Sequence, residues 1–447
     1  METKKTVLLL GDDIRTFSGV ANQSRESLFG LKERGFNCVQ IGASQGNKDK
    51  PQPVLWNDIK IYPSVNYGNQ RLVEQVMSIE NPDYMIIFTD PRYWRWLFQF
   101  EDSIRSKTPL LYYHLWDNEP YPFYNEIYYK SCDWIGCINR QSVDFVENVT
   151  KKEFDRTKWN LKYIPHGIDI DKFKPLTIED KHQKEFNEQF YGGNYDKFKY
   201  KILFNSRNAW RKNPANLMWA YNKFVKSLPT KEEQDQCLLV LHTDVIDNVG
   251  TDLDSVRRDL YPDVKIMFST KKLDPKYMPL LYNSVDVTVC PSSAEGFGLS
   301  FAESIMCGTP VISTITGGLQ DQMNIKYKDN CDKDYMHDDV WLGLKNGTNQ
   351  IESHGEWCIP LMPEARVMKG SVPTPYIYED YYSNDELTNA IYRMYHYDDR
   401  EARGEAGRKW MIDNNFTTTK LVDSFVEQFN VIDKNWKPVN NKRLAKI

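Results

Sequence analysis

Short apolar runs alternate along this chain with longer stretches that have helical periodicity. Runs such as Thr6–Leu10, Asp83–Thr89 and Cys237–Thr243 have the length of buried strands, and each is followed by a loop. Repeated strand, helix and strand units are typical of doubly wound sheets with helices on both faces. The pattern therefore predicts an α/β protein.

The alternation falls into two blocks, because the stretch between them is polar and charged and carries Gly192-Gly193. A chain of 447 residues is long enough for two domains of ordinary size. The expected segments are an N-terminal Rossmann-like domain over 1–175, a linker over 176–199, a second Rossmann-like domain over 200–415, and a C-terminal helix and basic tail over 416–447.

One stretch of the second block combines strand, glycine loop and helix. An alternating β-branched run ends at Cys290, Gly296 and Gly298 lie in the loop that follows, and a helical pattern begins at Leu299. Glycine lets backbone N–H groups approach a ligand closely, and a helix N-terminus attracts anions. The stretch therefore predicts an anion site in a βαβ unit.

Two carboxylates, Glu295 and Glu303, bracket this loop. Bare phosphate would be repelled by both, whereas a sugar nucleotide places phosphates on the N–H groups and hydroxyls on the carboxylates. The alternative is an ordinary crossover with solvated glutamates.

The run Glu295-Gly-Phe-Gly-Leu-Ser-Phe-Ala-Glu303 resembles the E-x7-E motif of retaining glycosyltransferases of the GT-B fold, in particular family 4. The following Gly-Thr-Pro-Val-Ile and Gly317-Gly318 are also similar to that family. The resemblance implies two doubly wound Rossmann-like domains that face each other across a cleft. It also implies that residues from about 323 to 375 are an insertion in the second domain, and that the helix and tail over 416–447 cross back onto the first domain. It further implies that the second domain binds the nucleoside diphosphate sugar, that the first binds the acceptor, and that the anomeric configuration is retained.

The resemblance also assigns roles to single residues. Arg207 and Lys212 would clamp the donor diphosphate, with Arg211 as a competitor, since fixed cations stabilise the charge of the leaving group without a metal. Glu303 would hold the ribose, and Glu295 would contact the transferred sugar. The catalytic set is then Glu295, His114, Arg207 and Lys212, and the donor-binding set is Gly19, Arg207, Lys212, Glu295, Gly296, Phe297, Gly298, Leu299 and Glu303.

Gly19 and His114 are the members of this set in the first domain. Gly19 opens the first predicted helix, where the resemblance places it near the donor; the alternative is a plain turn glycine. His114 ends a predicted strand, where open α/β sheets bind ligands, and would touch a sugar hydroxyl. The alternative is a histidine whose hydrogen bonds are satisfied within the fold.

Two further features admit several interpretations. The predicted helix 91–106 carries aromatic residues from Tyr93 to Phe100 beside arginines, and such residues either stack sugars or bases or pack a helix onto a sheet. The insertion contains Trp341 and Trp357, which is unusual for a slack loop. It is compatible with a subdomain, an oligomer contact or a wall of the acceptor site.

Composition narrows the function classes. The net charge of −5 argues against wholesale coating of nucleic acid. Eight scattered cysteines without C-x-x-C indicate buried thiols in a reducing cytoplasm, and no histidine spacing suits a metal. No run of about 20 apolar residues and no export signal is present, so we expect a cytoplasmic protein, or a host-cytoplasmic one if phage-encoded. We expect no metal and no cofactor beyond the donor.

The acceptor is not determined by these patterns. A glycan or a small molecule is the most generic acceptor, and a hydroxymethylated DNA base, as used by phage-type enzymes of this fold, is an alternative that the aromatic run and the basic tail motivate. A catalytically silent sugar-nucleotide binding module and a sugar-nucleotide epimerase also stay open.

Overall fold

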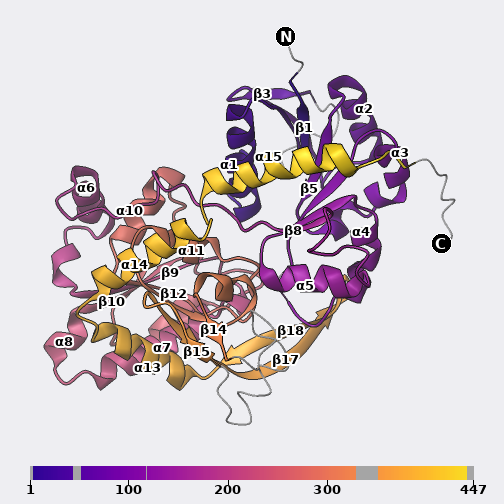
Figure 1. Ribbon diagram of the computed structural model, residues 1–447. Coiled ribbons are helices and arrows are strands. Elements are labelled where there is room, and N and C mark those ends of the chain that lie inside the picture. Colours follow the sequence, from indigo (N-terminus) through magenta and orange to yellow (C-terminus); the bar gives the residue numbers. More distant parts are fainter. Residues whose placement is uncertain (1–3, 44–51, 117, 329–350, 440–447) are drawn as a thin grey trace. The chain divides into compact units, whose positions relative to one another are not determined.

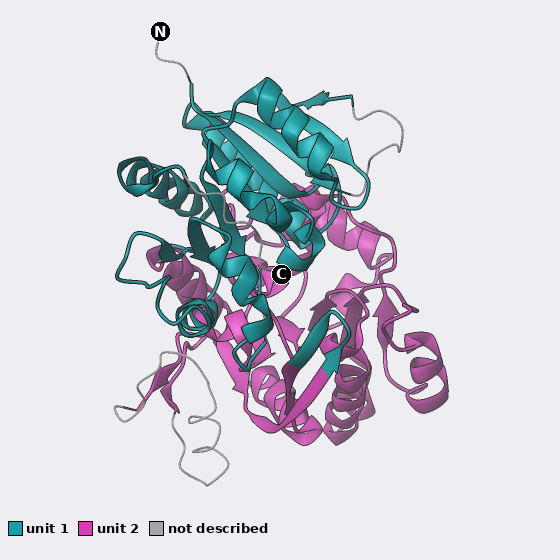
Figure 2. Ribbon diagram, turned by 90° about the vertical axis from the view of Figure 1, so that its right-hand side faces the viewer, with its two compact units in different colours: residues 1–167, 370–376, 415–447 teal, residues 168–369, 377–414 magenta. Residues whose placement is uncertain are grey.

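The computed structural model describes residues 4–43, 52–116, 118–328 and 351–439, and the chain forms two compact units (Figure 2). Unit 1 consists of residues 1–167, 370–376 and 415–447, and unit 2 consists of residues 168–369 and 377–414. Each unit is built on its own largely parallel sheet with flanking helices (Figure 1). The predicted α/β class with two Rossmann-like domains is confirmed.

Unit 1 contains an eight-stranded sheet in the order β3-β4-β2-β1-β5-β6-β7-β8. All neighbours are parallel except β3 and β4. The strands are β1 (Thr6–Asp12), β2 (Asn37–Ala43), β3 (Val54–Trp56), β4 (Ile59–Ser64), β5 (Tyr84–Phe88), β6 (Leu110–His114), β7 (Trp134–Cys137) and β8 (Leu161–Tyr163). Their side chains are nearly all buried in β1, β5, β6 and β7, as a sheet covered on both faces requires.

The helices of unit 1 include the last one of the chain. They are α1 (Gly19–Glu33), α2 (Gln70–Glu80), α3 (Glu101–Arg105), α4 (Glu126–Lys130), α5 (Arg140–Val149) and α15 (Thr418–Asn435). Helix α15 packs on α1, where Val422 lies so close to Gly30 that a Cβ there would meet its Cγ2 at 2.3 Å. Its buried face, with Leu421, Phe425 and Phe429, belongs to the core of this unit.

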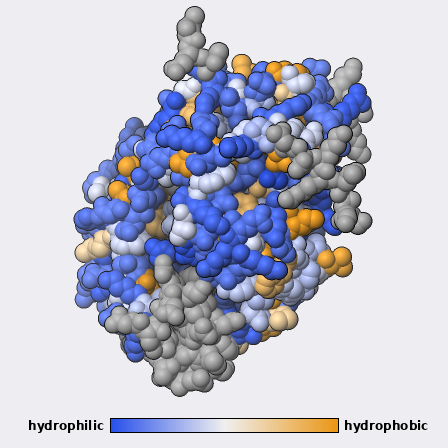
Figure 3. Space-filling model, turned by 45° about the vertical axis from the view of Figure 1, so that its right-hand side comes forward, coloured by the Kyte–Doolittle hydropathy of each residue, from blue (hydrophilic) through white to orange (hydrophobic). Residues whose placement is uncertain are grey.

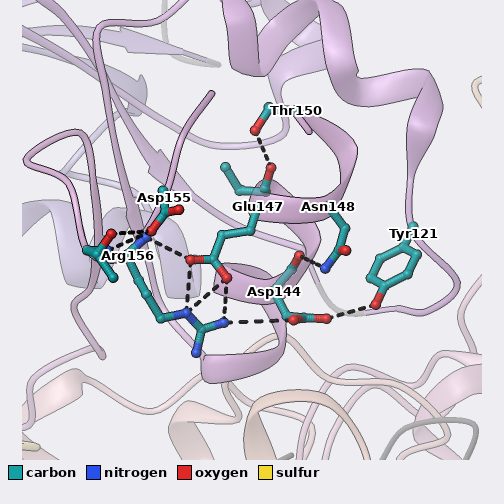
Figure 4. Close-up of polar contacts among 9 residues, drawn as sticks. Tyr121, Asp144, Glu147, Asn148, Thr150, Asp155 and Arg156 are labelled. Atoms are coloured by element: carbon teal, nitrogen blue, oxygen red, sulfur yellow. Dashed lines mark hydrogen bonds and ion pairs between the residues drawn. The ribbon is translucent and has the colours of Figure 1, made fainter. Parts of the chain in front are cut away.

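Helix α5 is fixed by polar contacts as well as by its apolar face (Figure 4). The guanidinium of Arg156 donates to both oxygens of Glu147, at 2.9 Å from Nε and 2.7 Å from Nη2, and lies 3.8 Å from Asp144. Asp144 also accepts a hydrogen bond of 3.0 Å from the hydroxyl of Tyr121. These contacts tie the loop after α5 to the helix.

The prediction of one helix over 91–106 was wrong. The segment forms two 3-10 turns, Pro91–Trp94 and Leu97–Gln99, before the short helix α3. Trp94 and Leu97 are fully buried, and Trp96, Phe98 and Phe100 pack against the core of the unit, whereas Tyr93 is exposed. The aromatic run therefore serves mainly to pack the segment onto the sheet, and packing overrides its helical periodicity.

Unit 2 contains a parallel six-stranded sheet in the order β11-β10-β9-β12-β13-β16. The strands are β9 (Tyr200–Asn205), β10 (Cys237–His242), β11 (Ile266–Phe268), β12 (Val287–Cys290), β13 (Val311–Thr314) and β16 (Cys358–Leu361). The strand order reverses between β9 and β12, because β10 and β11 continue on one side and β13 on the other. Ligands of open α/β sheets bind at the carboxyl ends of the strands at such a point.

The helices of unit 2 cover this sheet. They are α6 (Lys181–Phe190), α7 (Pro214–Ser227), α8 (Lys231–Asp235), α9 (Leu253–Ser255), α10 (Met278–Asn283), α11 (Leu299–Met306), α13 (Asn384–Tyr395) and α14 (Arg400–Asp413). Helices α7 and α13 contact each other and share the apolar core with β9 and β10.

Residues 176–199 differ from the expected linker. They contain α6, whose Gln183 donates to the carbonyl of Leu280 at 2.9 Å, and Tyr191, whose hydroxyl lies 2.9 Å from that of Ser284. Gln183, Phe186 and Tyr191 are buried. The polar composition of the segment comes from its outer face, and its inner face packs into unit 2.

The expected insertion at 323–375 also differs in the structure. Strand β16 pairs with β13 and completes the main sheet, so this part of the segment belongs to the Rossmann-like core. Trp357, next to β16, packs on Gly407 and Trp410 of α14. The remainder comprises β14 (Lys326–Tyr327) with β15 (Ile351–Ser353) and the paired ribbon of β17 (Pro363–Ser371) and β18 (Thr374–Tyr382), while Trp341 lies outside the described residues.

The face of the molecule drawn in Figure 3 is mainly hydrophilic. On the face in Figure 3, apolar side chains appear mostly in small groups among hydrophilic ones. Within the described ranges, no helix is both long enough and apolar enough to cross a membrane.

Candidate functional site

The predicted donor residues of unit 2 gather where its strand order reverses. Arg207, Arg211 and Lys212 follow β9, and Glu295 follows β12, the strand that pairs with β9. Neighbouring parallel strands end at the same edge of a sheet, so the two loops meet there. The structure therefore brings together residues that lie more than 80 positions apart in sequence.

A buried ion pair joins these loops. The ammonium of Lys212 contacts the Oε2 atom of Glu295, and the two side chains are only 11% and 17% exposed. Arg211 lies 3.5 Å from the same oxygen through Nη1. Glu295 is thus held by two cations, and both loops present charge at one place.

Backbone hydrogen bonds also connect the loops after β9, β12 and β13. The carbonyl of Arg211 accepts a hydrogen bond of 2.7 Å from the N–H of Ser293, and the carbonyl of Glu295 accepts one of 2.9 Å from Gly318. Gly318 has no room for a Cβ, which would lie 2.1 Å from the carbonyl oxygen of Gly296. The strand-end loops after β9, β12 and β13 therefore form one closely packed assembly.

The predicted glycine loop leads directly into α11. Gly298 caps this helix with a φ of +85°, a conformation that favours glycine, and a Cβ there would meet Leu319 at 2.4 Å. Phe297 is buried and Leu299 is the first helical residue. The positive end of the helix dipole thus lies beside Gly296 and Phe297, as an anion site requires.

Glu303 lies one turn inside α11 and is part of a hydrogen-bonded chain. The hydroxyl of Tyr282 donates to its Oε2 atom at 2.7 Å, and the side-chain amide of Asn205 donates to that hydroxyl at 2.7 Å. Burial, with the nearby carboxylate of Glu303, raises the pKa of Tyr282 well above its ordinary value. The phenol is therefore neutral, and its hydroxyl proton forms the hydrogen bond to Glu303.

Arg207 is bound differently from Lys212. Its guanidinium forms two parallel hydrogen bonds with Asp247, Nε to Oδ2 at 2.6 Å and Nη2 to Oδ1 at 2.9 Å, and its side chain is 64% exposed. The hydrogen bond to Arg207 lowers the pKa of Asp247, and the pKa of Arg207 is raised in turn. Arg207 lies at the strand edge predicted for it, with its Nε–Nη2 edge engaged by this carboxylate.

The ribbon β17–β18 reaches the same loops through Asp380. Its carboxylate accepts a hydrogen bond of 2.8 Å from the hydroxyl of Thr316 and one of 2.7 Å from Nε of Arg366. Its backbone N–H donates a hydrogen bond of 2.8 Å to the carbonyl of Ser293. Asp380 and Arg366 are buried. The ribbon thereby supports the loops after β12 and β13 from outside the main sheet.

Gly19 and His114 lie in unit 1. Gly19 is the first residue of α1 and directly follows Ser18, which caps the helix. The hydroxyl of Ser18 donates a hydrogen bond of 2.5 Å to the carboxylate of Asp12. His114 is fully buried at the end of β6, its Nε2 atom lies 2.8 Å from the hydroxyl of Tyr129, and burial lowers its pKa to about 3. Its Nδ1 atom is buried and has no hydrogen-bond partner within the described residues, so the fold satisfies only one ring nitrogen. The roles of Gly19 and His114 toward a donor stay predictions.

Sequence reasoning singled out neither Asp247, Tyr282, Asn205 nor Asp380. Asp247 and Asn205 follow or end buried strands, which is a usable signal for a ligand edge. Tyr282 and Asp380 carry no such signal, because a helix and a ribbon bring them to the site. No group of side chains that suits a metal ion occurs within the described ranges.

Comparison with known proteins places a family match on this same region. Residues 186–329 match the model for glycosyl transferases group 1. The D-inositol 3-phosphate glycosyltransferase of Corynebacterium jeikeium is 28% identical over 172 residues, 37% of this chain and 38% of that protein. The alpha-monoglucosyldiacylglycerol synthase of Streptococcus pneumoniae is 28% identical over 158 residues, 35% of this chain and 33% of that protein. The chain therefore matches well under half of the length of these relatives.

Solved structures are similar over nearly the whole chain. The sucrose-phosphate synthase of Thermosynechococcus elongatus gives a TM-score of 0.66 at 14% identity and covers 96% of this chain and 100% of its own. Anabaena HepE in complex with UDP and glucose gives a TM-score of 0.64 at 14% identity and covers 96% of this chain and 100% of its own. At this identity the likeness shows the fold, and with the strand orders above it establishes that this chain has the GT-B fold, with residues 186–329 matching the model for glycosyl transferases group 1.

Proposed function

We propose that this protein is a glycosyltransferase that moves a sugar from a nucleoside diphosphate sugar to an acceptor hydroxyl with retention of configuration. The observation that carries the proposal is the joined cluster of Lys212, Arg211 and Glu295 beside the N-terminus of α11. It lies inside the segment that matches glycosyl transferases group 1.

The charges of this cluster suit the donor. Fixed cations and a helix N-terminus stabilise the negative charge that grows on the leaving diphosphate, so Lys212, Arg211 and Arg207 take the part of a metal ion in the proposal. Glu295, held by the cations, would face the transferred sugar, and Glu303 would bind the ribose. Anabaena HepE has been solved with UDP and with UDP-glucose, which supports a sugar nucleotide as the donor class.

The first test is nucleotide binding. Thermal unfolding is measured with UDP, ADP, GDP and TDP, and a ligand at 100 times its Kd adds about 2.7 kcal/mol to stability. The expected result is stabilisation by one nucleotide, and Lys212→Ala removes it because Glu295 is left beside the phosphates with one cation fewer. Lys231→Ala, which removes an exposed lysine of α8, is the matched control and keeps the stabilisation.

The second test is transfer itself. The protein is incubated with the sugar derivatives of the selected nucleotide and with glycan and small-molecule acceptors. Release of nucleoside diphosphate only when an acceptor is present supports transfer, and nuclear magnetic resonance of the product reads the anomeric configuration. Conversion of the donor sugar without acceptor supports an epimerase, and binding without turnover supports a silent binding module.

Glycosylation of a hydroxymethylated DNA base remains the alternative acceptor. Of the aromatic run that motivated it, Tyr93 is exposed and stacks on Tyr67 at 4.7 Å between ring centroids, whereas Trp94 is buried. Duplex binding that weakens steeply with salt, together with transfer to modified duplex, would support this acceptor. Binding that is absent at low salt would remove it.

A further inference from the structure

The hydrogen-bonded chain Asn205–Tyr282–Glu303 has one fixed direction. A phenol has a single proton to donate, and the amide of Asn205 approaches its oxygen as a donor. The proton of Tyr282 is therefore directed to Oε2 of Glu303, at 2.7 Å. The phenol is fully buried, so water does not compete for it.

The three residues come from three separate elements. Asn205 ends β9, Tyr282 lies in α10 and Glu303 lies in α11. Tyr282 thus bridges the strand end that leads to Arg207 and the helix that begins at the glycine loop. The carboxylate of Glu303 is held at a set place relative to both loops of the cluster.

A carboxylate held in this way suits a pair of neighbouring hydroxyls. Ionised carboxylates only accept hydrogen bonds and have about four acceptor positions, so one carboxylate can accept from several hydroxyls at once. Sites built to bond a substrate hydroxyl reject the analogue that lacks it, because the buried acceptor is then left unsatisfied.

We propose that Tyr282 and Asn205 are positioning residues that orient Glu303 toward the 2′ and 3′ hydroxyls of the donor ribose, and so make the site select ribonucleotides over 2′-deoxyribonucleotides. This inference rests on the proposed function, since it assumes that a nucleoside diphosphate binds at the cluster.

The test is calorimetric titration of the full chain with matched pairs: UDP and 2′-deoxy-UDP, ADP and 2′-deoxy-ADP, GDP and 2′-deoxy-GDP. The wild type is expected to bind the preferred ribonucleotide at least about tenfold more tightly than its deoxy counterpart, the range for one hydrogen bond to a charged group. Tyr282→Phe is expected to weaken the ribonucleotide by about tenfold and the deoxynucleotide little, so that the ratio approaches one. Tyr277→Phe, at a partly exposed tyrosine in the turn before α10, is the control and keeps the wild-type ratio.

A second variant keeps the test independent of the tyrosine. Asn205→Ala leaves Tyr282 and Glu303 in place but lets the phenol proton rotate, and a ratio between those of the wild type and Tyr282→Phe is expected. Circular dichroism and the midpoint of thermal unfolding show that each variant is folded.

The outcomes separate this inference from the proposed function. If a ribonucleotide binds and Tyr282→Phe and Asn205→Ala keep the wild-type ratio, the positioning role is wrong and the donor site stands. If the wild type binds the deoxynucleotide equally well, the ribose assignment of Glu303 is wrong as well. If no nucleotide binds at all, the proposed function fails and this inference fails with it.

Discussion

Single residues of the glycine loop before α11 are constrained by backbone conformation and close packing. Gly298 has a φ of +85°, and any Cβ there would meet Leu319 at 2.4 Å. Gly192 also has a positive φ, +57°, but a Cβ there has nothing within 4 Å. Substituting these two glycines therefore distinguishes backbone strain alone, at Gly192, from strain combined with steric overlap, at Gly298.

Gly298→Ala is expected to destabilise the protein by about 2–4 kcal/mol, since left-handed strain adds to overpacking. Gly192→Ala should cost only the strain, about 1 kcal/mol. Urea unfolding of the two variants beside the wild type measures the difference. Equal losses would mean that the loop relaxes away from Leu319.

Two fully or nearly fully buried histidines give unit 1 a dependence on pH. Burial lowers the pKa of His114 and of His166 to about 3, against an ordinary value near 6.5. Between those values the unfolded chain binds a proton that the native chain lacks, so stability falls as pH drops from 6.5 toward 3. The loss is about 1.4 kcal/mol for each histidine and pH unit within that window.

His166→Gln is expected to flatten this slope by the share of one histidine between pH 6 and pH 4.5, whatever it does to stability at pH 7. Urea unfolding at several pH values reads the slope. An unchanged slope in His166→Gln would show that His166 is protonated in the native state.

At the scale of elements, the last helix is integral to the first unit. Helix α15 lies across α1, and the two helices meet at Gly30 and Val422, where the absence of a side chain lets them approach. A glycine inside a helix usually costs about 0.5–1 kcal/mol relative to alanine, so propensity alone favours Gly30→Ala. The contact with Val422 reverses that expectation.

We expect Gly30→Ala to destabilise the protein by about 1–3 kcal/mol through overpacking. The double variant Gly30→Ala/Val422→Ala should recover part of the loss, because the shorter side chain makes room for the new methyl group. A double-mutant cycle from urea unfolding gives the coupling energy. Independent, additive effects would mean that α15 does not pack on α1 at this point.

The elements also show where local patterns mislead. The aromatic run after β5 was expected to be one helix, but it forms two 3-10 turns before α3, with Trp94 and Leu97 buried. Residues 176–199 have the composition of a linker, yet α6 buries Phe186 in unit 2. In both cases the observed structure follows the burial of these side chains and not the local sequence pattern.

At the scale of the whole molecule, the cysteines report on packing in both units. Cys38, Cys132, Cys137, Cys237, Cys307 and Cys358 are buried and Cys290 is partly exposed, and all seven are free. Burial raises the pKa of Cys290 to about 11 and that of Cys38 to about 12. Because the thiolate is the reactive form, these thiols are protected at pH 8.

In the variant Cys331→Ser, which removes the eighth cysteine, an aromatic disulfide reagent at pH 8 is expected to find no rapidly reacting thiol in the native protein. All seven thiols should react in guanidinium chloride. Absorbance of the released thiolate counts them. Fast labelling of native Cys290 would show that the loop before α11 opens readily.

The sequence by itself determined the class of fold and the local structure of the glycine loop before α11. Consecutive apolar residues identify buried strands, and a glycine loop before a helix has a fixed local geometry, so the strand β12 and the helix α11 could be predicted from neighbouring residues alone. The pairing of Lys212 with Glu295 was decided by the tertiary structure, since strand order brings the two loops to one edge. The contacts of Asp247, Tyr282 and Asp380 were decided there too, as was the sixth strand β16 within a supposed insertion. These depend on contacts between distant segments, which no local pattern of hydrophobic and polar residues encodes.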